Sequence, residues 1–261
     1  MRTKPDYANW MPAEMVYGGA LGTGLLAAAD AVVSRSDLPH RKPLSFLLKA
    51  GAGAAGLWTV YSYAARSAFS YEGKRQLSKD IIEGIAEYVN LPEGGTCLDV
   101  GCGSGALTIA VAKRNPAATV TGIDPWGMEY RDFSRQVCID NAEAEGVNNV
   151  RFEKGNAIKL DYPDGCFDAV TSNYVYHNII GKNKQDLLLE TLRVLKKGGT
   201  FAIHDLMSES RYGDMFSFVK KLRDMGYKEV RLIDTRREFF KNQTEANLLM
   251  LGGSRLLTGR K

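Results

Sequence analysis

The stretch "CLDVGCGSGALTIAVAKRNP", residues 97–116, decides the fold of this chain. It begins with a short apolar run around one aspartate and ends in a helical pattern, with Gly101, Gly103 and Gly105 between the two. These glycines let the backbone turn with positive φ and leave room for a ligand. A tight turn that binds nothing is the alternative, because a glycine spacing by itself is weak evidence. The stretch therefore predicts a strand, a turn and a helix, with a candidate ligand loop where the strand ends.

The chain beyond residue 70 continues this alternation of strands and helices. Strand patterns, with the turns that follow some of them, cover 97–100, 118–124, 150–157, 167–179 and 200–206. Helical patterns cover 74–89, 106–115, 130–146 and 184–199. Connections of this kind are right-handed and place consecutive strands parallel to each other. The sequence therefore predicts an α/β fold with a doubly wound, mostly parallel sheet that is covered by helices on both faces.

Residues 1–70 differ from this pattern and predict a helical hairpin ahead of the domain formed by residues 71–261. Residues 15–33 and 44–65 are mostly small and apolar, and a polar segment separates them. Each stretch has about the ~20 residues that a helix needs to cross a bilayer. The hairpin is therefore expected either at a membrane or against the domain.

The hairpin has two interpretations. In the first, residues 15–65 contact or span a membrane, and Gly18 with Gly22 lets the two helices approach closely. Two observations argue against it. Asp30 and Lys49 lie inside the apolar stretches. The positive-inside rule would also place the basic connection between the helices in the cytoplasm, whereas a spanning hairpin attached to a cytoplasmic domain would place that connection outside. In the second, the hairpin is a soluble cap over the substrate or an arm that forms a homodimer. Both interpretations remain open at this point.

Composition and charge narrow the class of protein. With 44% hydrophobic and 25% charged residues, the chain is neither disordered nor dependent on disulfides. Its four cysteines lack metal-ligand spacing, so we expect reduced thiols in a cytoplasmic setting and no metal site. The formal net charge of +4 is mild and the basic residues are spread among acidic ones, a pattern that does not predict a nucleic-acid partner.

Two carboxylates indicate which ligand the glycine loop would bind. Asp124 ends the second predicted strand, where a carboxylate accepts hydrogen bonds from the two hydroxyls of a ribose. A dinucleotide-binding fold has the same features, and Gly101, Gly103 and Ala106 satisfy its GxGxxA variant. Asp99, however, comes two residues before the first glycine, where its charge opposes a pyrophosphate and suits a ligand that carries an ammonium and a sulfonium. The residues therefore favour a positively charged nucleoside.

Five motifs in order resemble the class I S-adenosylmethionine-dependent methyltransferases of the small-molecule type. They are "LDVGCGSG" (98–105), "VTGIDP" (120–125), "GNA" (155–157), "FDAVTSNYVYHNI" (167–179) and "LRVLKKGGTFAIHDL" (192–206). The resemblance covers residues 71–261 and is specific for the family, although it says little about the substrate. It implies a seven-stranded sheet in which the last two strands, 228–235 and 254–261, form a hairpin and the seventh strand is antiparallel.

The resemblance also implies which residues bind the cofactor, S-adenosyl-L-methionine, and its product S-adenosyl-L-homocysteine. The methionine part would lie against Asp99, Gly101, Cys102, Gly103 and Gly105. The nucleoside part would lie against Asp124 at the ribose and against Pro125, Trp126, Asn156 and Ala157 at the adenine. Asn173 would lie beside the sulfonium. Many members have aspartate where this chain has Asn156, whose amide oxygen can still accept a hydrogen bond from the adenine amino group.

The candidates for proton transfer follow the fourth and fifth predicted strands: His177, Tyr174 and His204. His177 is either a general base or a structural hydrogen-bonding residue. His204 precedes Asp205 and is either catalytic or one half of a satisfied polar pair with it. Tyr174 and Tyr176 alternate along an extended segment, so we expect only one of them to face the site.

The resemblance and the hairpin together predict a methyltransferase that acts on a small, apolar or lipid-like acceptor. Two alternatives are an NAD(P)-dependent reductase on a similar fold, which Asp99 and the "GNA" turn disfavour, and a non-catalytic protein that binds S-adenosylmethionine. We expect the protein in the cytoplasm, and at the inner face of the membrane if the hairpin is embedded there.

Overall fold

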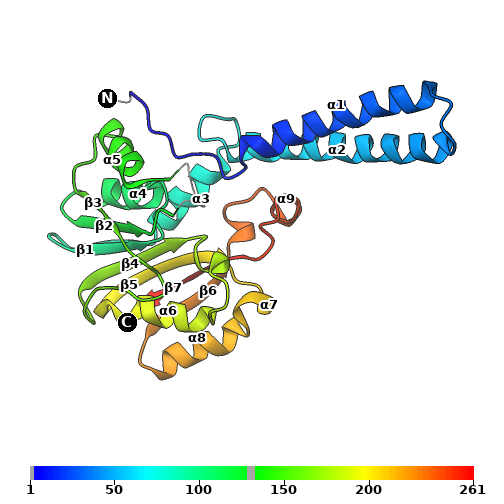
Figure 1. The fold of residues 1–261 in the computed structure, drawn as a ribbon. Coiled ribbons are helices and arrows are strands. Elements are labelled where there is room, and N and C mark those ends of the chain that lie inside the picture. Colours follow the sequence, from blue (N-terminus) through cyan, green and yellow to red (C-terminus); the bar gives the residue numbers. More distant parts are fainter. Residues whose placement is uncertain (1–2, 128–132) are drawn as a thin grey trace. The chain divides into compact units, whose positions relative to one another are not determined.

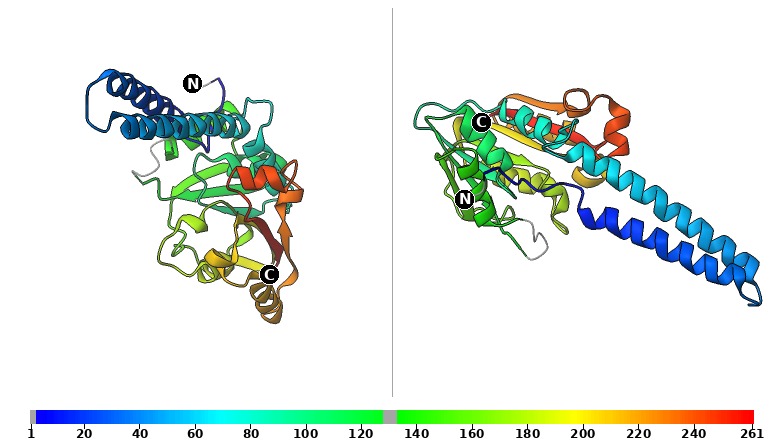
Figure 2. Two further views of the ribbon diagram at one scale, coloured as in Figure 1. Left: turned by 90° about the vertical axis from the view of Figure 1, so that its right-hand side faces the viewer. Right: turned by 90° about the horizontal axis from the view of Figure 1, so that it is seen from above.

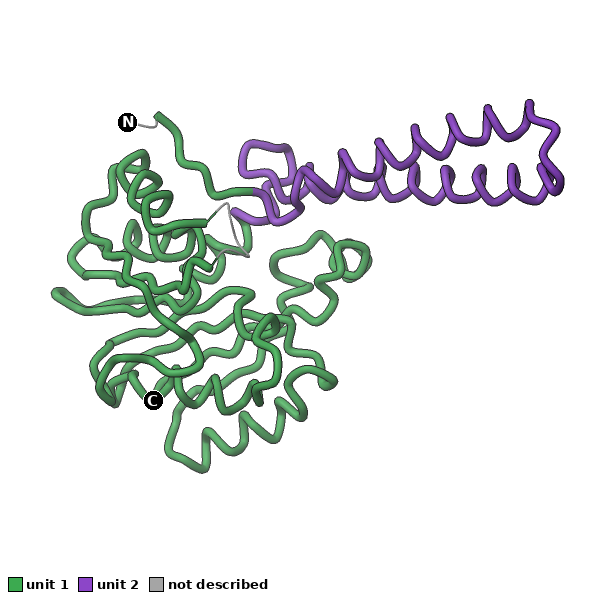
Figure 3. Tube along the Cα trace, in the orientation of Figure 1, with its two compact units in different colours: residues 1–8, 80–261 green, residues 9–79 purple. Residues whose placement is uncertain are grey.

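The structure is a computed structural model that describes residues 3–127 and 133–261. It contains two compact units (Figure 3). The larger unit joins residues 1–8 to residues 80–261, and the smaller unit consists of residues 9–79. The domain boundary expected between residues 70 and 71 thus falls inside the smaller unit, and the beginning of the chain belongs with the sheet.

A seven-stranded sheet with the order β3-β2-β1-β4-β5-β7-β6 forms the larger unit. Its strands are β1 (Thr96–Val100), β2 (Thr119–Asp124), β3 (Val150–Lys154), β4 (Phe167–Asn173), β5 (Leu195–Leu206), β6 (Lys228–Asp234) and β7 (Ser254–Arg260). Neighbouring strands are parallel except where β7 pairs with β5 and with β6. The predicted doubly wound, mostly parallel sheet with an antiparallel seventh strand is therefore confirmed.

β1 lies between β2 and β4 in the middle of the sheet. Its residue Leu98 pairs with Thr121 on one side and with Val170 on the other, and residues 97–100 are all buried. A strand that is covered on both faces has no solvent side, which is why its sequence is apolar apart from Asp99. Strand order reverses next to β1, so the glycine loop, residues 101–105, lies at the switch point where ligands bind in open α/β sheets.

Helices cover both faces of this sheet (Figure 1). One face carries α4 (Ala106–Arg114) and α5 (Arg135–Ala144), and the other carries α6 (Lys184–Arg193) and α8 (Met215–Asp224). The helix that the sequence predicts from residue 130 includes residues 130–132, which lie outside the described residues. α3 (Leu77–Ala86) crosses the boundary between the two units.

The end of α6 differs from the prediction. The helix expected over residues 184–199 ends at Arg193, and β5 begins already at Leu195. The backbone N–H of Gly165 donates to the Arg193 carbonyl at 3.1 Å, and that of Cys166 donates to the Val194 carbonyl at 2.8 Å. These hydrogen bonds pair the chain ahead of β4 with the end of the helix and thereby begin the strand early.

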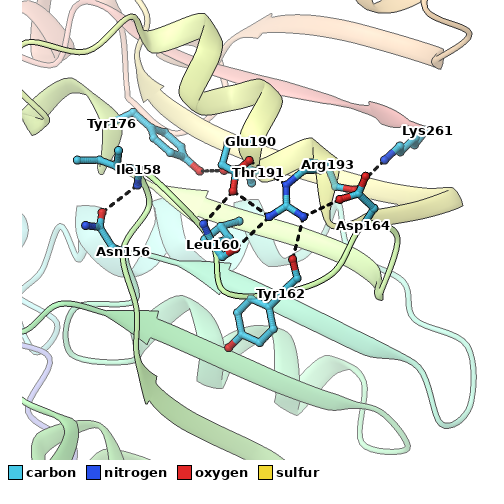
Figure 4. Close-up of polar contacts among 10 residues, drawn as sticks. All are labelled: Asn156, Ile158, Leu160, Tyr162, Asp164, Tyr176, Glu190, Thr191, Arg193 and Lys261. Carbon is cyan, nitrogen blue, oxygen red and sulfur yellow. Dashed lines mark hydrogen bonds and ion pairs between the residues drawn. The ribbon is translucent and has the colours of Figure 1, made fainter.

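The guanidinium of Arg193 ties the segment after β3 to α6 (Figure 4). It donates to the carbonyls of Leu160 and Tyr162 at 3.0 and 2.8 Å and to the carboxylate of Asp164 at 2.7 Å. The carboxylate of Glu190 accepts from Arg193 and from the N–H of Leu160. This network fixes the segment that leads from β3 to β4.

Two connections outside the five motifs contain helices. α7 (Glu209–Tyr212) and α8 connect β5 to β6. The connection from β6 to β7 contains the 3-10 helix η2 (Thr235–Arg237) and α9 (Gln243–Leu248), in which Thr235 and Ala246 are buried. The simple terminal hairpin that the resemblance implied is therefore enlarged by a folded insertion.

The smaller unit contains the predicted helical hairpin, α1 (Ala13–Arg35) and α2 (Arg41–Phe69), whose helices run side by side in every view (Figures 1 and 2). A Cβ atom at Gly19 would lie 2.5 Å from Oγ1 of Thr59, and one at Gly22 would lie 3.9 Å from the Cβ atom of Ala55. The small residues thus let two antiparallel backbones approach closely, but at Gly19 and Gly22 and not at the predicted Gly18, where no described atom lies within 4 Å of the position of a Cβ.

α1 contains no buried residue, and its apolar residues do not gather on one face. Leu21, Leu25 and Val32 are each more than 60% exposed, at 65%, 62% and 70%. Among the helices of the described residues, α1 alone is long and apolar enough to cross a membrane.

Candidate active site

The glycine loop after β1 turns with φ values of 74° at Gly101, 55° at Gly103 and 85° at Gly105. A Cβ atom at Gly101 would lie 2.3 Å from a methyl group of Val175, so only glycine allows the exit of β4 to pack against the loop here. At Gly103, no described atom lies within 4 Å of the position a Cβ would take. The backbone of the loop is therefore open to a ligand at Gly103.

Asp124, at the end of β2, is hydrogen-bonded to this loop. The N–H of Gly103 donates to Oδ2 at 3.0 Å, and the N–H of Trp126 donates to Oδ1 at 2.8 Å. Burial raises the pKa of Asp124, and these two hydrogen bonds offset only part of the rise. Because each carboxylate oxygen has a second lone pair, Asp124 can accept further hydrogen bonds from a ribose diol.

Asp99 is buried at the end of β1, with 1% of its surface exposed. The hydroxyl of Thr108 donates to one carboxylate oxygen at 2.7 Å and that of Thr171 donates to the other at 3.0 Å. Burial raises the pKa of Asp99 to about 6 in spite of these hydrogen bonds. At pH 7 the group is ionised and places a negative charge next to the glycine loop. The contact expected between Asp99 and the methionine part of a cofactor stays a prediction.

Side chains from two other elements hold the glycine loop. The indole Nε1 of Trp126 donates to the Gly103 carbonyl at 2.9 Å, and the Cys138 thiol lies 3.1 Å from the same oxygen. The N–H of Cys102 donates to a carbonyl of β2, and its thiol is buried. Pro125 is exposed between Asp124 and Trp126. The adenine contacts expected for Pro125 and Trp126 stay predictions.

Asn156 and Ala157 lie in the turn that follows β3. The side-chain oxygen of Asn156 accepts a hydrogen bond from the N–H of Ile158 at 2.9 Å (Figure 4). Ala157 is 8% exposed and contacts the core. The oxygen of Asn156 has a second lone pair, which is the one that the predicted contact with adenine would need.

His177 pairs with Asp205 across the ends of β4 and β5. The ring Nδ1 lies 2.5 Å from Oδ1 of Asp205, and the side chains are 13% and 0% exposed. Asp205 also accepts hydrogen bonds from the backbone N–H groups of Tyr176, His177 and Leu206. Burial raises the pKa of Asp205, but the hydrogen bonds from His177 and the backbone outweigh it, and the pKa lies below its usual value. An ionised Asp205 holds the proton on Nδ1 and leaves Nε2 as the acceptor.

His204 has a different environment. It is fully buried, with Nδ1 at 2.8 Å from the side-chain oxygen of Asn173 and Nε2 at 2.9 Å from the hydroxyl of Thr235. Burial lowers its pKa to about 3, so the ring is neutral and both nitrogens are engaged. The polar pair expected between His204 and Asp205 is wrong, because neighbouring residues of a strand point to opposite faces. These contacts favour a structural role for His204 over the catalytic one predicted.

The two tyrosines after β4 take different positions, but the extended segment expected for them is wrong, because β4 ends at Asn173 and Tyr176 begins the 3-10 helix η1 (Tyr176–Asn178). Tyr176 is fully buried, and its hydroxyl lies 2.6 Å from that of Thr191 in the core. Tyr174 has a φ of 55°, which is strained for a bulky residue. Its hydroxyl lies 2.6 Å from that of Ser254, and its ring centroid lies 4.7 Å from that of His204. Burial raises the pKa of Tyr174, so its hydroxyl stays protonated at neutral pH.

The carboxyl edge of the sheet thus carries two groups of predicted residues. The first consists of the glycine loop with Asp99, Asp124 and Trp126, and the second of Asn173, Tyr174, His177 and His204. The side chain of Val175 contacts Gly101 and so joins the groups.

Sequence reasoning missed two features of this edge. It did not find the threonines that bind Asp99, because nothing in their sequence context marks them. It also did not find that Asp205 pairs with His177. A charged residue in the apolar run "TFAIHDL" was the available signal for Asp205.

Residues 91–241 match the family described as "Methyltransferase domain". The chain is 34% identical over 133 residues to a demethylmenaquinone methyltransferase of Bacillus licheniformis, an alignment that covers 51% of this chain and 52% of the relative. It is 29% identical over 129 residues to a sterol 24-C-methyltransferase of Aspergillus fumigatus, covering 49% of this chain and 32% of the relative. The chain therefore spans between a third and about half the length of these relatives.

Among solved structures, the fold is similar to that of the [4+2]-cyclase SpnF. The TM-score is 0.54 and the sequence identity 23%, over 72% of this chain and 82% of the other. This likeness concerns the fold alone.

Proposed function

Because the chain belongs to the family of methyltransferase domains, we propose that it transfers a methyl group from S-adenosyl-L-methionine to a small, lipid-like acceptor. The observation that carries the proposal is the 3.0 Å hydrogen bond from the Gly103 backbone to Asp124. It joins an open glycine loop to a carboxylate suited to a ribose, and both lie at the switch point of the sheet.

The residues of this edge fit the cofactor by the chemistry of their side chains. Asp124 offers acceptors for the ribose hydroxyls, and the open backbone at Gly103 allows close approach. The buried charge of Asp99 favours the ammonium and the sulfonium and disfavours a pyrophosphate. When bound, the cofactor supplies an electrophilic methyl group, and its transfer leaves S-adenosyl-L-homocysteine.

We assign the role of general base to His177. Asp205 fixes the ring through Nδ1, so Nε2 is the nitrogen that can take a proton from the methyl acceptor. Asp205 acts through His177 and is a positioning residue. The ring is 13% exposed, which gives an acceptor access to it while most of the ring stays shielded from water.

The names of the relatives support a lipid-like acceptor. One is named for demethylmenaquinone and the other for a sterol, and both names denote largely apolar molecules. An apolar acceptor also agrees with the exposed apolar surface of the hairpin, which would concentrate the protein where such molecules dissolve.

We further propose that the hairpin contacts a membrane. A helix that is apolar on all sides needs an apolar environment, and α1 has no buried residue. Its 23 residues make it roughly 35 Å long, enough for the ~30 Å of a bilayer core. Asp30 accepts a hydrogen bond from Ser45, and the Lys49 ammonium lies 3.8 Å from its carboxylate, so the charges inside the hairpin are paired. The enzyme would then work at the cytoplasmic face of the membrane.

A methyl-transfer assay tests the proposed function. The full chain, supplied with S-adenosylmethionine carrying a tritiated methyl group, should label a component of a lipid extract. Asp124→Ala should abolish the label at a cofactor concentration that saturates the unaltered chain. Tight binding of S-adenosylhomocysteine without transfer to lipids, phenols, thiols or amines would instead identify a non-catalytic protein.

A further inference from the structure

The start of the chain is bound to the rest of the larger unit through the buried side chain of Asn141 on α5. The N–H of Asp6 donates to its Oδ1 at 2.7 Å, and its Nδ2 donates to the Asp6 carbonyl at 2.9 Å. The same Nδ2 donates to the carbonyl of Ser104 at 3.0 Å. Asn141 is fully buried. One amide group therefore holds the N-terminal segment, residues 5–8, and the glycine loop together.

Ser104 forms a second connection between the segment and the loop. Its hydroxyl donates to the Tyr7 carbonyl at 3.1 Å, and its surface is 6% exposed. Tyr7 is itself buried, and its hydroxyl donates to the carboxylate of Glu145 at 3.2 Å. The N-terminal segment is thus held at two successive residues: Asp6 is bound by Asn141 of α5, and Tyr7 is bound by Ser104 in the glycine loop.

The residues that bind the N-terminal segment are adjacent to the candidate cofactor site. Ser104 follows Gly103, whose N–H donates to Asp124 and whose carbonyl accepts from Trp126 and lies against the Cys138 thiol. Cys138 and Asn141 lie one turn apart on α5, and both are fully buried. One face of α5 therefore contacts two neighbouring carbonyls of the loop, those of Gly103 and Ser104. The N-terminal segment binds the same face of α5 through Asn141.

We propose that Asn141 and Ser104 are positioning residues, which use the N-terminal segment to fix the glycine loop in the conformation that binds the cofactor. The inference rests on the proposed function, because it assigns the cofactor to this loop. The physical reason is entropic: three glycines have wide conformational freedom, and a loop ordered before binding costs less affinity than one ordered by the ligand.

The test measures S-adenosylhomocysteine affinity by calorimetry and amide hydrogen exchange of residues 101–108 in the full chain. Asn141→Leu removes all three hydrogen bonds, and Asp6→Pro removes only the backbone N–H of the segment. Each should weaken affinity about 10-fold and speed exchange of the loop. Asp6→Ala is the matched control, since it keeps the N–H and the carbonyl that Asn141 binds.

Asn115→Leu is the control for a merely structural effect. Asn115 also bridges backbone groups, accepting from Leu91 and donating to the carbonyls of Val89 and Val111, but it lies at the opposite end of α4 from the loop. Its loss should lower the melting temperature and leave affinity within about 2-fold.

A double-mutant cycle decides between positioning and general stabilisation. Once Asp6→Pro is present, Asn141→Leu should cost less affinity than it does alone, because both changes break the connection to Asp6 and only Asn141→Leu also removes the hydrogen bond to the Ser104 carbonyl. Additive losses, or wild-type affinity and loop exchange in both variants, would overturn the inference. If Asn141→Leu does not fold, Asp6→Pro and Ser104→Ala carry the same test. Failure of the unaltered chain to bind S-adenosylhomocysteine would refute the proposed function instead, while loop exchange would still report on the connection.

Discussion

The ring Nδ1 of His177 lies 2.5 Å from Oδ1 of Asp205, a carboxylate that also accepts three backbone N–H groups. These backbone hydrogen bonds hold the carboxylate in place, and the carboxylate in turn orients the imidazole ring. Such an arrangement sets the tautomer of the histidine as well as its orientation, and both matter for a base that acts through Nε2.

Removing the charge of Asp205 should therefore impair turnover without affecting cofactor binding. Asp205→Asn presents an NH2 group to Nδ1 and favours the tautomer in which Nε2 carries the proton. We expect kcat to fall roughly 10²-fold, as for His177→Ala, with S-adenosylhomocysteine affinity within about 2-fold. Wild-type turnover in either variant would reduce His177 to a residue that lines the site.

His204 should matter for stability. His204→Gln disturbs the hydrogen bonds to Asn173 and Thr235, and we expect a loss of about 1 to 3 kcal/mol in the free energy of unfolding at pH 7, measured with urea. Its pKa is about 3 in the folded chain, below the ordinary value of 6.5, so its neutral form stabilises the fold. That contribution is complete above pH 6.5 and declines as the pH falls toward 3. The difference in the free energy of unfolding between the unaltered chain and His204→Gln should therefore shrink as the pH falls over this range. A difference that stays constant would contradict the buried, neutral environment assigned to His204.

Asp99 predicts a pH dependence of cofactor binding. Its pKa is raised to about 6 by burial, so the carboxyl loses its charge as the pH falls through that value. S-adenosylmethionine carries the sulfonium that this charge favours, and its affinity should decrease below about pH 6. Calorimetry from pH 5 to pH 8 checks this, with Asp99→Asn as the variant in which the dependence should disappear. An unchanged profile in that variant would show that another group is responsible.

The hairpin predicts binding to lipid vesicles. The full chain should float with vesicles at both low and high salt, because burial of apolar surface is not screened by ions. Replacing the exposed Leu21 and Leu25 by lysine should release it, since each lysine at membrane depth costs about 2.5 to 3.5 kcal/mol. Glu14→Gln, at the beginning of α1, is the control. A monodisperse dimer without detergent, indifferent to vesicles, would identify the hairpin as a dimerisation arm.

The sequence predicted the sheet well because its signals are local and physical. Buried central strands such as β1 read as apolar runs, and the glycines at 101, 103 and 105 can be read as a turn without knowledge of their neighbours. Asp124 could be placed in the same way, because a residue at the carboxyl end of a parallel strand must lie at the carboxyl edge of the sheet.

Partners across the fold could not be predicted in this way. The pairing of His177 with Asp205 depends on which face of β5 each residue takes, and adjacent residues of one strand were paired in error. The insertion between β6 and β7, which supplies Thr235 to His204, has no periodic pattern long enough to read. The contact of Asp6 with Asn141 joins residues far apart in sequence that no local pattern connects.

The central claim is that Asp124 and the glycine loop bind a positively charged nucleoside. Titration of S-adenosylhomocysteine into the unaltered chain and into Asp124→Ala tests it most directly, with NAD as the competitor. We expect binding to the unaltered chain that NAD does not displace, and a loss of roughly 2 to 4 kcal/mol in the variant. Binding of NAD together with no binding of S-adenosylhomocysteine, or equal affinity in the two proteins, would contradict the claim.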